Sequence, residues 1–159
     1  MLFKSAFTAL ALGLLPFTAQ AQDFSTLVNE DFLRETFPFA EGDSLKYAAC
    51  DVKTVFTCTY IWGAASDRDA TLASLGRPPS GNKVMLMYAE TGGIAVWPRI
   101  ANSYSDGEEI AGLGQAAIWS AQRGQLSFMS PSNVLVHVNV GDYGKEEALA
   151  TAAHLLTAL

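Results

Sequence analysis

The first 21 residues constrain this chain most, because they have the pattern of a segment that is removed before the rest folds. Lys4 precedes a mostly apolar run over residues 6–15, and Ala-Gln-Ala at 19–21 supplies the small residues that signal peptidase requires. The run is shorter than the roughly 20 residues that span a bilayer, and no cysteine follows the cleavage site to carry a lipid. We therefore expect a signal peptide over 1–21, a single domain over 22–159 and no stable membrane anchor.

The acidic charge of the chain limits its partners. The whole sequence carries a net charge of −6, and residues 22–159 carry −7 because Lys4 is the only charged residue of the leader. The remaining basic residues are scattered singly, whereas nucleic acids and anionic membranes bind dense positive patches. We expect neither as a partner. The composition, with 50% hydrophobic and 16% charged residues, is that of a folded domain that needs no metal ion for its core.

An exported chain meets an oxidising compartment, so its only two cysteines, Cys50 and Cys58, favour a disulfide. The seven residues between them have strand-like ends, and a chain reversal near Thr54 would place the two thiols opposite each other. A hairpin separates such Cα atoms by about 5.5 Å, within reach of a disulfide. A redox-active pair and two free thiols are the alternatives, although the spacing differs from the Cys-x-x-Cys motif of redox enzymes.

The order of helix-like and strand-like segments predicts an α+β domain. We expect helices over residues 23–37, 64–75 and 145–159, and a short helix that begins near Pro98. We expect strands over residues 45–51, 55–62, 83–90, 116–121, 125–129 and 134–140. The last three strands would form an antiparallel meander, and the apolar run at 83–90 suits a central strand buried on both faces. Ser25 or Thr26 would cap the first helix, and residues 106–109 would form an exposed acidic loop.

The final strand and the final helix have clear apolar faces. In the strand, alternate valines at 134, 136, 138 and 140 would face the core, and Leu135, His137 and Asn139 would face water. In the helix, an apolar stripe is expected at Leu149, Ala152, Ala153, Leu156 and Leu159. Both elements therefore have one side available for packing and one side in solvent.

Four patterns with chemical meaning fail in their local context. Residues 112–117 match Gly-x-Gly-x-x-Ala, but the segment lacks the preceding strand and following helix of a dinucleotide site. Residues 80–83 match Ser-x-x-Lys, but in a turn that cannot give the helical geometry of penicillin-binding enzymes. Residues 67–78 lack the glycine and the final glutamate of a calcium loop, and His137 and His154 lack metal-ligand spacing. We predict no cofactor, no metal site and no catalytic residue.

Several short motifs follow one another in a familiar order. They are Cys58-Thr59-Tyr60, the Gly-Leu-Gly-Gln-Ala-Ala-Ile-Trp sequence at 112–119, Gly124-Gln125-Leu126 and the alternating valines before the final helix. The chain resembles small exported bacterial envelope proteins of unknown function, many of them lipoproteins, that carry Cys-x-Tyr and Gly-Leu-Gly-x-x-Ala motifs. The resemblance implies a curved antiparallel sheet with the N- and C-terminal helices packed on one face, and it transfers no catalytic residue. This chain departs from the lipoproteins by lacking their lipidated cysteine.

The absence of a catalytic pattern favours a binding role in the periplasm or outside the cell. We expect a non-catalytic bacterial protein that binds a partner protein or a small envelope ligand. Its candidate binding surface comprises Trp97, His137, Asp106, Glu108 and Glu109. Two alternatives stay open: an inhibitor of a cationic periplasmic enzyme such as lysozyme, which an acidic surface would suit, and an unrecognised enzyme that uses His137 with a neighbouring carboxylate.

Overall fold

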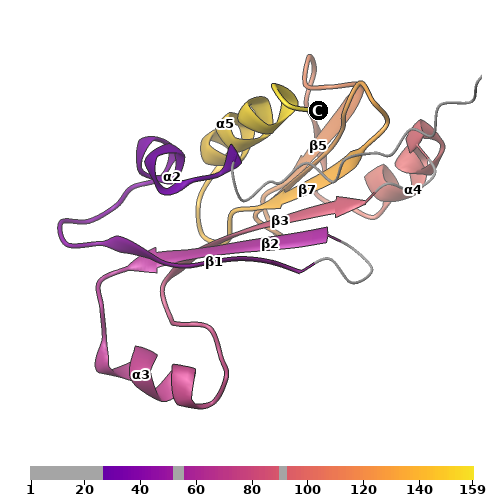
Figure 1. Cartoon of the computed structure of the whole chain (residues 1–159). Helices are drawn as coiled ribbons and strands as arrows, with labels where there is room; N and C mark the ends of the chain where they lie inside the picture. The colour runs from indigo at the N-terminus through magenta and orange to yellow at the C-terminus, as the bar shows by residue number, and fades with distance from the viewer. Residues whose placement is uncertain (1–26, 52–55, 90–92) are drawn as a thin grey trace, which may run out of the picture.

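A computed structural model of the chain describes residues 27–51, 56–89 and 93–159 (Figure 1). Its helices are α2 (Glu30–Thr36), α3 (Asp67–Ser74), α4 (Trp97–Asn102), α5 (Lys145–Leu156) and the 3-10 helix η1 (Gly93–Val96). Its strands are β1 (Ser44–Asp51), β2 (Phe56–Gly63), β3 (Asn82–Ala89), β4 (Glu108–Glu109), β5 (Ala116–Ser120), β6 (Gln125–Met129) and β7 (Leu135–Asn139). The predicted signal peptide and the predicted helix cap at Ser25 or Thr26 lie outside the described residues. None of the helices in these three ranges is long and apolar enough to cross a membrane.

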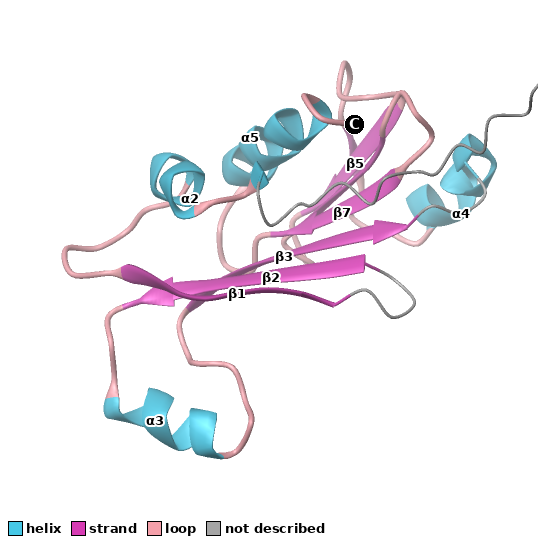
Figure 2. Cartoon of the chain, in the orientation of Figure 1, coloured by secondary structure: helices cyan, strands magenta, loops and turns pink. Residues whose placement is uncertain are grey.

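These strands form one open antiparallel sheet in the order β1-β2-β3-β7-β6-β5-β4. Strands β1 to β3 make one meander, β4 to β7 make a second, and the pairing of β3 with β7 joins the two. The segment with η1 and α4 connects β3 to β4, and β4 forms the edge of the sheet opposite to β1. Helix α4 is labelled in Figure 2. The predicted α+β fold, with helices near both ends of the chain and an antiparallel sheet between them, is confirmed.

One face of the sheet carries the hydrophobic core under α2 and α5 (Figure 1). Helix α5 packs on β6 and β7 and also contacts α2. The valines that we expected to face inward are buried, with Val136, Val138 and Val140 wholly inaccessible and Val134 at 8% exposure. Removal of apolar area from water is the main stabilising contribution here, at about 25 cal/mol per Å².

Trp62 holds together three segments that are distant in sequence. Its fully buried indole stacks on Phe39, which follows α2, with ring centroids 5.1 Å apart, and on Tyr143, which precedes α5, at 5.7 Å. Phe37 packs edge-on against Tyr143 at 5.2 Å. This aromatic cluster fixes the entry to α5 relative to the exit from α2, and so it sets how the two helices lie together.

The buried stripe of α5 is shifted by one position from our prediction. The residues that reach the core are Ala148, Thr151, Ala152 and Leu155, whereas Ala153 is exposed and Leu149 and Leu156 are half-buried. Both sets follow helical spacing, so periodicity alone could not choose between them. Thr151 is accommodated because its hydroxyl donates to the carbonyl of Glu147 at 2.8 Å.

The side chains on the second face of the sheet are less exposed to solvent than we predicted. Leu135 is 5% exposed and His137 is half-buried, and Tyr104, which follows α4 and is 7% exposed, is hydrogen-bonded to Ser127 beside His137 on this face. Strand β3 is also not buried on both faces: Val84 and Leu86 reach the core, but Met85 is only half-buried on the other face. Although the sequence of β3 is a continuous apolar run, its side chains alternate between the buried core face and the half-buried second face of the sheet.

Three helices begin with residues that commonly start helices. Asn29 caps α2 by accepting the backbone N–H of Phe32 at 2.9 Å, so within the described residues the cap lies later than predicted. Ser66 precedes α3, which begins later than the predicted residue 64, and forms a capping box with Asp69. Pro98 lies in the first turn of α4, where a missing N–H costs nothing.

The predicted disulfide is present. Cys50 of β1 and Cys58 of β2 are direct partners in the ladder and are joined by a disulfide, with their Cα atoms 4.0 Å apart instead of the expected 5.5 Å. The predicted reversal near Thr54 lies outside the described residues. Cys58 is fully buried on the core face, so the bridge fastens the edge strand β1 to the core.

Candidate functional site

The five residues of the predicted binding surface occupy separate environments. His137 belongs to a polar network on the second face of the sheet. Asp106 forms hydrogen bonds within the protein, and Glu108 forms an ion pair. Glu109 and Trp97 line a cavity of about 420 Å³ beside residues 111–115, which we call the glycine-rich loop. The sequence grouped them by residue type, and the structure does not bring them together into one site.

The network around His137 is a closed set of hydrogen bonds. Its Nδ1 atom lies 2.6 Å from the Ser127 hydroxyl and 3.3 Å from Nε2 of Gln125, and Gln125 also donates to the Tyr104 hydroxyl at 2.6 Å. The Tyr104 hydroxyl is in turn hydrogen-bonded to Ser127. Burial lowers the pKa of His137 and keeps the imidazole neutral, so that Nδ1 can accept. These contacts anchor the segment after α4 to the sheet.

The same network offers little support for catalysis by His137. A serine hydroxyl bonded to an imidazole occurs in hydrolases, where a carboxylate orients the imidazole and the serine is open to substrate. Ser127 is fully buried, and among the described residues no carboxylate is hydrogen-bonded to His137. The hydrogen bonds satisfy polar groups that the sheet buries.

The predicted acidic loop is instead a structured edge of the sheet. Asp106 accepts from the backbone N–H of Gln122 at 2.9 Å and from the Ser120 hydroxyl at 2.6 Å, and these bonds lower the pKa of its carboxyl. Glu108 pairs with Lys145 at 2.7 Å. Glu108 and Glu109 form the two-residue edge strand β4, which is too short and too charged for the sequence pattern to reveal.

The cavity beside the glycine-rich loop has a rigid wall. Gln115 donates through its backbone N–H to the carbonyl of Met129 at 2.7 Å, and its side-chain amide donates to the carbonyls of Ser130 and Pro131 and to Asn133. Gly114 has a φ of 62°, and a Cβ atom there would lie 2.2 Å from the Met129 carbonyl oxygen. Residues 111–115 therefore form a tight turn that leads into β5.

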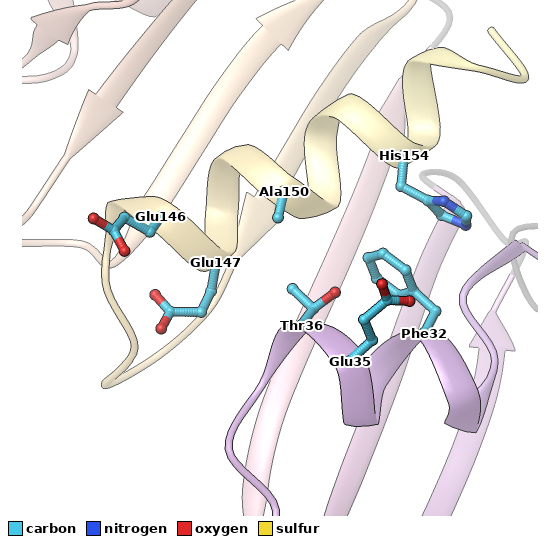
Figure 3. A pocket seen from close by; sticks show the side chains of 7 residues that line it. All are labelled: Phe32, Glu35, Thr36, Glu146, Glu147, Ala150 and His154. Atoms are coloured by element: carbon cyan, nitrogen blue, oxygen red, sulfur yellow. The ribbon is translucent and has the colours of Figure 1, made fainter.

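A groove between α2 and α5, which the sequence analysis missed, gathers more charge than any of these places. Its volume is about 520 Å³, and Figure 3 shows side chains from both helices facing it. Helix α2 contributes Phe32, Glu35 and Thr36, and helix α5 contributes Glu146, Glu147, Ala150 and His154. Each set recurs at three- and four-residue intervals, so each helix presents one side to the groove.

The groove is acidic, with three carboxylates in its lining. Glu147 accepts the backbone N–H of Gly144 at 3.0 Å, which caps α5. Neither Glu35 nor Glu146 forms a hydrogen bond or an ion pair with another described residue. The start of α5 favours Glu146 and Glu147, since the positive end of the helix dipole lies there. Among the residues that the structure describes, the lining thus holds these negative charges without a lysine or arginine.

One end of the groove is closed by two stacked rings. The rings of Phe32 and His154 lie face to face, with centroids 4.2 Å apart and planes 16° from parallel. Nε2 of His154 is 2.8 Å from the carbonyl oxygen of Leu27, and this contact fixes the imidazole against the backbone just before α2. Among the described residues no group of three or more His, Cys, Asp and Glu is placed to hold a metal ion.

Comparison with protein-family models, with curated proteins and with solved structures finds no match to this chain.

Proposed function

We propose that this chain is a non-catalytic exported protein, and that the α2–α5 groove receives a positively charged side chain of a partner protein. The observation that carries this proposal is the groove itself, whose lining includes Glu35, Glu146 and Glu147 and, among the described residues, no lysine or arginine. A guanidinium or ammonium group would form ion pairs with these carboxylates and a cation–π contact with the Phe32 ring. Opposite charge on a partner would also speed the encounter.

A binding assay with short peptides tests the proposal. We expect a labelled tetra-arginine peptide to bind the protein at low ionic strength, an acidic tetra-glutamate peptide not to bind, and added salt to weaken the complex. The double variant Glu35→Gln with Glu146→Gln removes two charges and is expected to weaken binding by about tenfold. The matched control is Glu41→Gln with Asp142→Asn, which also removes two exposed carboxylates, both outside the groove lining and without an ion pair among the described residues. Equal loss in both variants would contradict the assignment of the groove.

An inhibitor of a cationic enzyme is a second candidate that the same groove favours. Such an inhibitor would place its carboxylates against basic residues around the active site of the target. Lysozymes, tested as a panel at low salt, are the direct assay: inhibition that disappears in the Glu35→Gln, Glu146→Gln variant supports this candidate. Unchanged lysozyme activity contradicts it and leaves the groove with another cationic partner.

Export to the bacterial periplasm or the medium is part of the proposal, and the Cys50–Cys58 disulfide supports it because such bonds persist in oxidising compartments. Mass spectrometry of the protein from the envelope fraction is expected to find Gln22 as the first residue and a mass two hydrogens below that of the reduced chain. An intact Met1 on a reduced cytosolic protein would overturn this part.

A further inference from the structure

Helix α3 stands apart from the remainder of the structure. It lies below the strands in Figure 1, whereas α2 and α5 lie above them. None of its residues is buried, and Leu75, which follows its last turn, is 65% exposed. A single exposed leucine is common on protein surfaces, but a whole helix without a buried residue adds little to the core of its own chain.

The helix is nevertheless held in one position. Asp69 accepts from Lys46 of β1 at 2.8 Å, from the backbone N–H groups of Ser66 and Ser80, and from the Ser80 hydroxyl. At the other end, Gly76 adopts a φ of 65°, and the backbone N–H groups of Gly76 and Arg77 close the helix on the carbonyls of Ala73 and Leu72. Residues 64–81, which we call the α3 arm, thus form a fixed projection.

The uncompensated charge of the α3 arm is positive. Arg68 and Arg77 are exposed, and neither forms an ion pair with a described residue. The charge of Asp69 is matched by Lys46, which leaves Asp67 as the other acidic residue of the arm. Two arginines beside an exposed leucine complement a groove that contains three glutamates and the ring of Phe32.

We infer that the α3 arm of one copy of this chain docks into the α2–α5 groove of a second copy, with Arg68 or Arg77 among the groove carboxylates. The inference rests on the proposed function, since it names an occupant for the same groove. The arm and the groove lie on opposite sides of the strands (Figure 1), so an arm cannot enter the groove of its own chain. The contact is head-to-tail, and it therefore continues into chains of copies instead of stopping at a dimer.

Sedimentation velocity of the protein at increasing concentration and low salt tests this inference. We expect species larger than a dimer, and we expect high salt to dissolve them. The arm variant Arg68→Glu with Arg77→Glu, and the groove variant Glu35→Lys with Glu146→Lys, are each expected to be monomeric because arm and groove then carry the same sign. An equimolar mixture of the two variants is expected to associate again, since each arm then meets a groove of opposite charge.

The matched control is Lys83→Glu with Arg99→Glu, which reverses two exposed charges outside the α3 arm and is expected to associate like the unmodified protein. Leu75→Ser is expected to weaken association by about tenfold if the leucine contributes its apolar contact. Unmodified protein that stays monomeric, an arm variant that still associates, or a mixture that stays monomeric would each overturn the inference. Binding of the tetra-arginine peptide by a protein that does not self-associate would overturn this inference and leave the proposed function standing.

Discussion

Phe32 and His154 stack ring on ring with centroids 4.2 Å apart, although one belongs to the first described helix and the other to the last. The stack is the direct contact between α2 and α5 at the end of the acidic groove. The width of the groove therefore depends on a pair of residues from opposite ends of the chain.

Phe32→Ala is expected to lower the free energy of unfolding by about 2 kcal/mol, less than for a fully buried phenylalanine because Phe32 is half-buried. Phe32→Leu keeps apolar contact without an aromatic ring, and we expect it to lose about half as much. Urea denaturation measures both. A Phe32→Leu variant as stable as the unmodified protein would show that ring stacking contributes nothing beyond apolar area.

Acidification is expected to destabilise the protein through His137. Burial lowers its pKa in the folded state below the value of about 6.5 in the unfolded chain, so the unfolded state binds more protons between these two pKa values. This contribution to stability is complete above pH 6.5 and decreases as the pH falls through that window. His137→Gln is expected to flatten the decline in denaturation midpoint between pH 7 and pH 5, and His154→Gln is the histidine control. An unchanged slope in His137→Gln would contradict the assignment.

Asp69→Asn is expected to loosen the α3 arm without unfolding the sheet. The carboxylate holds Lys46, Ser66 and Ser80 together, and the hydrogen bond from Lys46 is the main reason why the pKa of Asp69 lies far below its usual range. Trypsin is expected to cleave after Arg68 several times faster in the variant, whereas the bond after Arg77 is resistant because Pro78 follows it. Asp67→Asn, which removes an exposed carboxylate of the same helix, is the control, and equal cleavage of both variants would refute the tether.

Gly114→Ala is expected to be much more damaging than Gly112→Ala. Both glycines have positive φ values, so an alanine at either position costs about 1 kcal/mol in backbone strain. A Cβ atom at Gly112 meets no atom within 4 Å, whereas at Gly114 it would lie 2.2 Å from the Met129 carbonyl oxygen. Thermal denaturation compares the variants, and a similar melting temperature for both would mean that the turn can shift away from β6.

The strands and the disulfide were predictable because their signals are local. Alternating valines in β7 and matched strand-like segments around Cys50 and Cys58 specify faces and partners within a few residues. The stripe of α5 was displaced by one position because apolar residues occur in both helical registers, and the register that is buried, which includes Thr151, is the less apolar of the two. Strand β4 was missed because two glutamates do not resemble a strand.

The candidate site was harder to predict from the sequence than the strands and the disulfide. Glu35 and Glu147 lie in the first and last described helices, and their proximity depends on how Trp62 fixes the connecting segments. Glu35 in one predicted helix and the Glu146-Glu147 pair in another were visible in the sequence, but nothing local indicated that the two helices lie side by side. Trp97 and Glu109 do share a cavity, although the sequence offered them only as exposed candidates.

The β3–β7 pairing has a consequence for the order of folding. Each meander pairs strands that follow one another in sequence. Its hairpins with loops of a few residues can form on the microsecond scale, and the connection between β2 and β3 is longer because it contains the α3 arm. Joining Met85 to Asn139 closes a far longer loop, whose entropic cost must be met before the pairing adds stability. We expect the two halves of the sheet to be preformed when they meet, so that substitutions at the β3–β7 seam, such as Leu86→Ala, slow folding more than equally destabilising substitutions between β1 and β2.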